Sequence, residues 1–505
     1  MSLKITVFIC GAAVMIIEIL GSRLLAPAYG SSITVWTSII VVVLAFLSLG
    51  YHRGGILADK NPGIDVLAGI ISKTALFTIL IPIINVFFTS ILSSPSDILI
   101  IGPVLSSLAV LAIPSYLFGL ISPYAIKLSL KEMHSAGKVS GNLYAISTVG
   151  SIAGTFLTGF FLIPHFRITT IIYALAMLLA FVSLCLRGRR MLYDFLTVLL
   201  IAIILISYFP SYSAQTVPSA SREYSRILWE KESHYNLILV KEADDERIIQ
   251  IGITIQSGVN TTSGEGIAEY MKQIHFAWLL NPNIEKVAAL GCGAGVIPRD
   301  IHRNYPKTAI DVVDIDSDVF YAADNFFGLR EDERMIFNVG DARAFIKNSE
   351  DKYDLIVMDV YSSTYAIPNH LVTKEMMMEM KKHLTEEGVV YFNVISSLNE
   401  SRSLFLRSMY KTIRQVFPTV YLIPTDENNS NRDFMNIVLF ATNSDKRYSK
   451  EELIAIKDSY NRSDYINDKL DKSLNMLQTE DVNQSGAIVF YDDYAPVDYM
   501  LFKNA

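Results

Sequence analysis

Three carboxylates that follow short apolar runs are the residues in this 505-residue chain most suited to chemistry: Asp314, Asp341 and Asp359. A glycine-rich turn holding Gly291, Gly293 and Gly295 follows a fourth such run. In a doubly wound sheet the carboxyl ends of the strands share one edge, where ligands bind. Glycines let the backbone approach a ligand, and a carboxylate accepts hydrogen bonds from ribose hydroxyls. The pattern therefore predicts a nucleoside site.

Each of these acids also has a simpler interpretation, because an aspartate after a strand often caps the next helix. Four successive strand ends that all offer glycine or carboxylate favour a ligand site over caps alone. The turn lacks the full dinucleotide fingerprint, and no Lys-Ser/Thr pair follows it, so phosphate binding is not favoured. We expect Asp314 to suit a ribose diol, and Asp341 with the backbone of Ala342 to suit adenine.

The elements that must position these residues alternate as strand and helix, which predicts a parallel sheet covered on both faces. We expect a Rossmann-like α/β domain of the methyltransferase type over residues 285–505 and a small subdomain over 226–284, with a β-hairpin (229–240 and 247–255) and a helix (263–280). Segment 434–441 reads as a late antiparallel strand. The expected strands are 287–290, 310–313, 335–339, 355–358 and 389–394, and the helices are 316–327, 341–348, 374–385 and 399–416.

The first 209 residues have a different composition, typical of a membrane protein. Residues 1–210 contain 12 Lys and Arg against 6 Asp and Glu, whereas the remainder contains 31 against 44. A membrane-spanning helix needs about 20 apolar residues. We predict a helical transmembrane domain over 1–209, partly transporter-like, joined by a linker at 210–225. Its seven candidate spans are 4–26, 33–51, 67–89, 98–127, 142–164, 168–186 and 191–209.

Small residues in the fifth span, 142–164, predict close helix packing at the centre of the bundle. Two charges in the first span, Glu18 and Arg23, either pair or snorkel, or they contact a transported molecule. Basic residues follow the even-numbered spans, which places the N-terminus in the cytoplasm. A seventh crossing would then put the C-terminal domain outside, whereas a nucleoside co-substrate favours the cytoplasm. The chain is thus expected in the cell membrane, and the sequence does not decide which side of the membrane its soluble domain faces.

Composition also bounds the partners. The acidic soluble half argues against nucleic acid. Three cysteines, Cys10, Cys185 and Cys292, offer neither a disulfide framework nor a zinc site, and we predict no metal. The expected partners are the lipid bilayer and a small amine acceptor, and a homodimer is left open.

At these residues the chain resembles the spermidine synthase family of polyamine aminopropyltransferases, and more closely its membrane-fused members. The resemblance covers essentially the whole chain. It is carried by segments 290–295 with Arg299 and Asp300, 313–316, 340–345, 353–359, 367–371 and 492–497, and by 18–27 in the first span.

The resemblance implies decarboxylated S-adenosylmethionine, or S-adenosylmethionine, as a co-substrate, with no permanently bound cofactor. Asp359 matches the acid that acts as general base on the attacking amine, which is a nucleophile only when neutral. For such a transferase we expect the acceptor side to be formed by Tyr235, Tyr270, Tyr361, Ser362 and Pro368.

The sequence departs from the family at the acceptor side. Ser362 stands where soluble members have a second acid, Met271 and Lys272 stand where they have a histidine and an acid, and Ala294 replaces an acid of the glycine turn. Loss of these anchors weakens the case for putrescine. Aminopropyl transfer to an amine is the leading hypothesis. The alternatives are methyl transfer to an acceptor delivered by the membrane, a polyamine transporter or sensor with a non-catalytic nucleoside-binding domain, and a pseudoenzyme that faces outside the cell.

Overall fold

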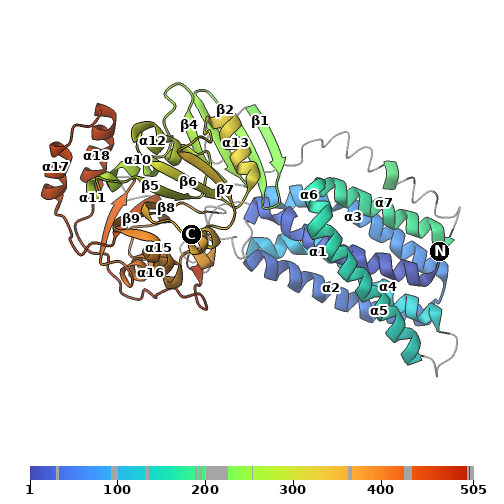
Figure 1. Cartoon of the computed structure of the whole chain (residues 1–505). Helices are drawn as coiled ribbons and strands as arrows, with labels where there is room; N and C mark the ends of the chain where they lie inside the picture. Colours follow the sequence, from blue (N-terminus) through green and yellow to red (C-terminus); the bar gives the residue numbers. More distant parts are fainter. Residues whose placement is uncertain are drawn as a thin grey trace. The chain divides into compact units, whose positions relative to one another are not determined.

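The computed structural model describes residues 1–29, 33–92, 101–130, 136–187, 226–252, 254–361, 367–425 and 435–497, and single positions at 192, 196, 198–200 and 500. The chain forms two compact units, Met1–Ala220 and Ser221–Ala505. Figure 1 shows helices alone in the first unit and strands with helices in the second. Each unit is described by itself.

Six helices of the described N-terminal residues are long and apolar enough to cross a membrane. The sixth predicted span, 168–186, corresponds to α7. The seventh, 191–209, lies almost entirely outside the described residues. The helices are α1 (Leu3–Tyr29), α2 (Ile33–Lys60), α3 (Ile64–Leu92), α4 (Ile101–Ser129), α5 (Ala136–Leu157), continued by the π-turn η2 (Thr158–Leu162) and α6 (Ile163–His165), and α7 (Ile168–Arg187).

The small residues of α5 do allow a close approach, but not at the centre of the bundle. A Cβ at Gly150 would lie 2.1 Å from the carbonyl oxygen of Phe8, and one at Gly154 would lie 2.5 Å from that of Ala12. Both contacts are with α1, and most of the remaining surface of α5 is exposed. The predicted central position was wrong, because the glycines form a single face.

The C-terminal unit contains the predicted Rossmann-like sheet, with seven strands in the order β10-β11-β9-β8-β5-β6-β7. The five strands β5 to β9 are parallel, and β11 pairs antiparallel with β9, as the late strand was expected to do. The strands are β5 (Lys286–Leu290), β6 (Ala309–Asp314), β7 (Met335–Val339), β8 (Tyr353–Met358), β9 (Leu384–Ser396), β10 (Thr419–Pro424) and β11 (Met435–Thr442).

Two apolar clusters cover the two faces of this sheet, because successive side chains of a strand point to opposite sides. Val287 and Ala289 of β5 pack with α12 and α13, whereas Ala288 packs on the other face with α14, α15 and α16. Figure 1 shows this layering. The helices are α12 (Val296–Asn304), α13 (Ser317–Phe327), α14 (Ala342–Asn348), α15 (Lys374–His383), α16 (Leu404–Arg414), α17 (Lys450–Ser459) and α18 (Asp464–Met476).

The region before the parallel sheet is larger than the predicted hairpin. It is a four-stranded antiparallel sheet of β1 (Arg226–Glu232), β2 (Leu237–Ala243), β3 (Glu246–Ile251) and β4 (Thr254–Asn260). Segment 229–240 is two strands rather than one, because Ser233 Oγ accepts hydrogen bonds from the backbone of Tyr235 and Asn236 and closes a turn.

Two predicted helices begin later than expected. The predicted helix 263–280 begins only at Glu269, as α10 (Glu269–Lys272), η4 (Gln273–Phe276) and α11 (Ala277–Leu280). A Cβ at Gly266 would lie 2.7 Å from Val296, the first residue of α12. The chain before α10 therefore packs closely against α12 and is not helical. The predicted helix 399–416 likewise starts at Leu404.

Candidate active site

The site is centred where strand order reverses, between β5 and its neighbours β6 and β8. Gly291, directly after β5, has φ +93°, and a Cβ there would lie 2.0 Å from the carbonyl oxygen of Asp359 after β8. Its N–H donates to Val313 on β6 at 2.8 Å. Only glycine fits this crossing, and crevices at such reversals are where open α/β sheets bind ligands.

The rest of the glycine turn is fixed by neighbouring elements. Gly293 and Gly295 have φ of +53° and +67°, and Gly295 directly precedes α12. The N–H of Ala294 donates to Ser257 Oγ of β4 at 2.6 Å. The antiparallel sheet therefore contributes a side chain that holds the turn.

Asp314 ends β6, and one of its carboxylate oxygens binds the glycine turn while the other binds the backbone just after β6. Oδ2 accepts from the N–H of Cys292 at 2.9 Å, and Oδ1 accepts from the N–H of Asp316 at 3.0 Å. Burial raises the pKa of Asp314 to about 6, against the lowering effect of these two backbone bonds. It does not cap a helix, since Asp316 caps α13. A carboxylate oxygen has two lone pairs, so each can accept a further hydroxyl.

Asp341 follows β7, and it does cap a helix. Its Oδ1 accepts from Ala344 N at 2.9 Å at the start of α14, and its Oδ2 lies 3.0 Å from His370 Nε2. Burial alone would raise the pKa of Asp341, but these two partners outweigh it and lower the pKa. The N–H of Gly340 donates to the carbonyl of Asp314 at 2.9 Å, so the two acids follow directly adjoining strand ends.

Asp359 follows β8 and is hydrogen-bonded by side chains from other elements. Asn393 Nδ2 of β9 donates to Asp359 Oδ1 at 2.8 Å, and the hydroxyl of Tyr270 is a second hydrogen-bond partner. Burial raises the pKa of Asp359, while these two donors lower it. A buried carboxylate with an elevated pKa is a suitable proton acceptor near neutral pH.

The predicted acceptor residues fall into three groups. Tyr270 and Tyr361 are near Asp359, and Tyr361 Oη accepts from Ile395 N at 2.8 Å. Tyr235 lies on the β1–β2 turn and is 46% exposed. Pro368 precedes the short 3₁₀ helix η5 (Asn369–Leu371), and Ser362 lies outside the described residues.

Sequence reasoning missed Asn393 and Ser257, which bind Asp359 and the glycine turn. Asn393 interrupts the apolar run of β9, and a lone buried amide in such a strand usually has a specific partner. The position of Asn393 within an apolar run could therefore have indicated its role from the sequence. Ser257 carries no comparable signal, because its strand was placed only approximately.

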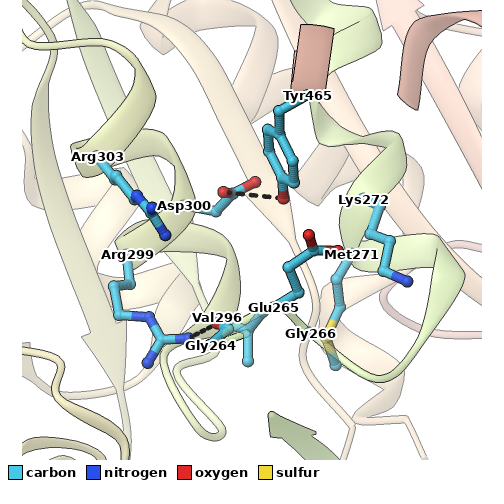
Figure 2. Close-up of a pocket in the computed structure, with 10 residues that line it drawn as sticks. All are labelled: Gly264, Glu265, Gly266, Met271, Lys272, Val296, Arg299, Asp300, Arg303 and Tyr465. Carbon is cyan, nitrogen blue, oxygen red and sulfur yellow. Dashed lines mark hydrogen bonds between the residues drawn. The ribbon is translucent and has the colours of Figure 1, made fainter. Parts of the chain in front are cut away.

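A pocket next to α12 shows what the Arg299–Asp300 pair does (Figure 2). Arg299 Nη2 donates to the carbonyl of Gly264 at 2.6 Å, and its Nη1 donates to that of Phe327. Tyr465 Oη donates to Asp300 Oδ1 at 3.3 Å. Arg299 thus ties the loop before α10 and the end of α13 to the helix that follows the glycine turn.

The charges of this pocket are largely compensated within the protein. His275 Nε2 lies 2.9 Å from Asp300 Oδ2, and Lys469 Nζ lies 3.5 Å from Glu265. Lys272 is paired with Glu269 at 2.7 Å. The pocket therefore has a structural explanation that needs no ligand.

A mixed, mostly parallel sheet with a glycine turn and acids at its reversal point defines a Rossmann-like α/β domain of the transferase type. Residues 268–446 match the spermine/spermidine synthase domain family. A polyamine aminopropyltransferase of Vibrio vulnificus (strain CMCP6) is 29% identical over 242 residues, which are 46% of this chain and 78% of that protein. The C-terminal unit is thus spermidine synthase-like, and the relatives support an aminopropyltransferase-like enzyme, which confirms the resemblance for this part of the chain.

Two further matches are of other kinds. The eEF1A lysine and N-terminal methyltransferase of Xenopus laevis is 29% identical over 192 residues, which are 35% of this chain and 26% of that protein. The solved structure of a probable spermidine synthase from Corynebacterium glutamicum ATCC 13032 has a TM-score of 0.42 at 20% identity, covering 55% of this chain and 99% of that one. The chain spans only about a quarter of the methyltransferase.

Proposed function

We propose that this protein is a membrane-bound transferase that moves an aminopropyl group from decarboxylated S-adenosylmethionine to an amine. The observation that carries the proposal is the carboxylate pair at the strand reversal. Asp314 and Asp359 flank Gly291, which contacts both strand ends. Asp314 would hold the ribose, and Asp341 with Ala342 the adenine. The donor's sulfonium would then lie between the nucleoside site and Asp359.

The reaction needs no group beyond these residues and the two substrates. The neutral amine nitrogen attacks the methylene carbon next to sulfur, a C–N bond forms, and the C–S bond breaks. The bonding electron pair stays on sulfur, which becomes the thioether of methylthioadenosine. The nitrogen releases one proton, and Asp359 accepts it before passing it to water. General-base catalysis of this kind contributes about 10²–10⁴-fold to a rate.

The enclosure of Asp359 suits this role. Most of an alkylamine is protonated at neutral pH, so a base whose pKa lies above the usual range for aspartate helps to remove that proton. Tyr270 and Asn393 hold the carboxylate in place, so no reorientation is needed during the reaction.

Methyl transfer from S-adenosylmethionine is the second candidate. It is favoured by the similarity to a lysine and N-terminal methyltransferase, and by Met271 and Lys272 at positions where polyamine-binding members have a histidine and an acid. Lys272 is bound to Glu269 next to the buried Tyr270, and this pair adds no net negative charge for a diamine.

The location proposed for the C-terminal unit is the cytoplasmic side of the membrane. The donor is made in the cytosol, and α2, α4 and α7 each have a basic residue in the last turn: Lys60, Lys127 and Arg187. With the N-terminus inside, six crossings return the chain to the cytoplasm. This proposal requires that the seventh predicted span, 191–209, does not cross the membrane. Digestion of residues 226–505 by protease in intact cells would contradict this.

The direct test is a transfer assay on the full-length chain in detergent. Decarboxylated S-adenosylmethionine and S-adenosylmethionine are each offered with putrescine, propylamine and spermidine, and products are identified by mass. We expect aminopropylated amine and methylthioadenosine from the first donor only. Products carrying a methyl group would favour the second candidate.

Asp359→Asn and Asp354→Asn form a matched pair for this assay. Asp354 also lies on β8, but at the opposite end, where Oδ2 accepts from the N–H groups of Glu285 and Lys286 at 2.9 and 3.0 Å. Asp359→Asn should lower kcat by about 10²–10⁴-fold while methylthioadenosine affinity changes little. Asp354→Asn should keep its kcat. Equal effects of the two variants would contradict the role of Asp359.

A further inference from the structure

A chain of two amides, the buried Asn393 and the half-buried Asn436, leads to the carboxylate of Asp359. Asn393 of β9, 4% exposed, donates from Nδ2 to Asp359 Oδ1 at 2.8 Å. Asn436 of β11 donates from its own Nδ2 to Asn393 Oδ1 at 2.9 Å. Asn393 thus has an acceptor on one side, Asp359, and a donor on the other, Asn436.

Strand register places these groups next to one another. Met358 pairs with Phe392 in parallel register, so the residues that follow, Asp359 and Asn393, are neighbours. In the antiparallel pair of β9 and β11, Asn393 is opposite Val438, and Asn436 is two residues away on the same face of the sheet. Diagonal neighbours of this kind are within reach of a side-chain amide.

The direction of the Asn393 amide follows from chemistry rather than from packing. An ionised carboxylate only accepts hydrogen bonds, so the group of Asn393 that faces Asp359 must be its NH₂. The oxygen then faces Asn436, whose NH₂ can satisfy it. Reversing the Asn393 amide would place two acceptors together at Asp359, so the arrangement has one stable orientation.

We infer that Asn393 is a positioning residue for the proposed general base, with Asn436 orienting it in turn. This inference rests on the proposed transferase function and adds to it the residues that set the base. Asn393 binds Oδ1, so the rotation of the carboxylate is fixed and Oδ2 keeps one orientation toward the acceptor. The amine can then deliver its proton without rotation of the carboxylate about χ2.

A second consequence concerns ionisation. A hydrogen bond to a carboxylate stabilises its charged form, and Asn393 is the main group that opposes the effect of burial on Asp359. Removing the Asn393 amide should therefore raise the pKa of Asp359 further. The carboxylate then stays protonated to a higher pH, and a protonated acid cannot act as base.

Asn393→Leu in the full-length chain tests the inference, because leucine has nearly the shape of asparagine without its amide. With decarboxylated S-adenosylmethionine and putrescine, propylamine or spermidine, we expect kcat to fall by about tenfold or more. The acid limb of the kcat profile should move to higher pH by about one unit. Methylthioadenosine affinity should stay within about threefold. A merely structural role would lower stability without moving the acid limb.

Two companion variants make the result decisive. Asn436→Leu should move the acid limb in the same direction by less, and it settles the matter if Asn393→Leu fails to fold. Asn443→Ala removes an amide just beyond the far end of β11, where Nδ2 donates to Thr385 at 3.0 Å, and it should leave the acid limb unchanged. Unchanged kcat and acid limb in Asn393→Leu, or in Asn436→Leu as its substitute, would overturn the inference while the proposed function stands. A wild-type chain that binds methylthioadenosine but transfers nothing would overturn both.

Discussion

Replacing Asp314 by asparagine separates a ligand-binding carboxylate from a purely structural one, because burial predicts a pH-dependent change in stability in either case, whereas only a ligand-binding role predicts a loss of donor affinity. The native carboxylate has a pKa of about 6, raised by burial. In the unfolded chain the same group titrates near 4. The folded state therefore keeps its proton to a higher pH than the unfolded state does.

The sign of the stability effect follows from proton binding. Between about pH 4 and pH 6 the folded state holds more protons at Asp314, so raising the pH in this window lowers the free energy of unfolding. A shift of about two units corresponds to about 3 kcal/mol, and the partial exposure of Asp314 reduces this to about 1–3 kcal/mol. Asp314→Asn lacks this titration. It does lose one acceptor for the N–H of Cys292 or Asp316, but that loss is the same at every pH.

Thermal unfolding of the full-length variant and wild type, measured across about pH 4 to pH 7, tests the stability part. The melting temperature of Asp314→Asn minus that of wild type should rise by about 2–10 °C over the window. Asp354→Asn, whose carboxylate also accepts two backbone N–H groups, is the matched control. A pH-independent difference for Asp314→Asn would refute the reasoning on burial.

The variant gains stability relative to wild type as the pH rises, but it should lose affinity for the donor. Hydrogen bonds to a charged group are worth about 1.5–3 kcal/mol each, and an asparagine retains only one acceptor oxygen for the ribose diol. Asp314→Asn should therefore weaken methylthioadenosine by at least about 30-fold at neutral pH, as measured by calorimetry. Asp354→Asn should bind within about threefold of wild type. Equal affinity in all three proteins would remove Asp314 from the proposed site.

Three further outcomes follow from particular contacts. Gly291→Ala should unfold the C-terminal unit or lower its melting temperature by about 10 °C or more, because its Cβ would lie 2.0 Å from the carbonyl of Asp359; Gly340, with open space around it, should accept alanine. Gly150→Leu should lower thermal stability in detergent by separating α5 from α1, whereas Gly141→Leu on the same helix should not. His370→Ala should raise the pKa of Asp341, so that methylthioadenosine affinity, followed by calorimetry, begins to fall at a higher pH on acidification; an unchanged pH dependence would count against a ligand role for Asp341.

The parallel sheet was predictable because its signals are local. Short apolar runs that end in glycine or aspartate define β5 to β8, and parallel strands bring such ends together. The antiparallel sheet was not, because its division depends on turns. Ser233 closes one turn with its hydroxyl, and Gly252, with φ +60°, follows β3 at the next.

The acids of the candidate site were predicted from the sequence, but their hydrogen-bond partners were not, and this difference has a physical basis. Acids at strand ends are visible because charge is unusual next to apolar runs. The hydrogen-bond partners of those acids come from distant segments, such as Asn393 to Asp359 and His370 to Asp341. Their pairing depends on strand register and loop paths, which a single sequence does not specify. The peripheral position of α5 escaped prediction for a similar reason, since small residues indicate a close approach but not its partner.

A structure of the full-length chain with methylthioadenosine bound is the most direct test of the central claim. The account predicts that ribose hydroxyls contact Asp314, that adenine lies next to Asp341 and Ala342, and that sulfur faces Asp359 across Gly291. A nucleoside that binds elsewhere on the chain, or strand ends that stay empty at saturating ligand, would contradict it.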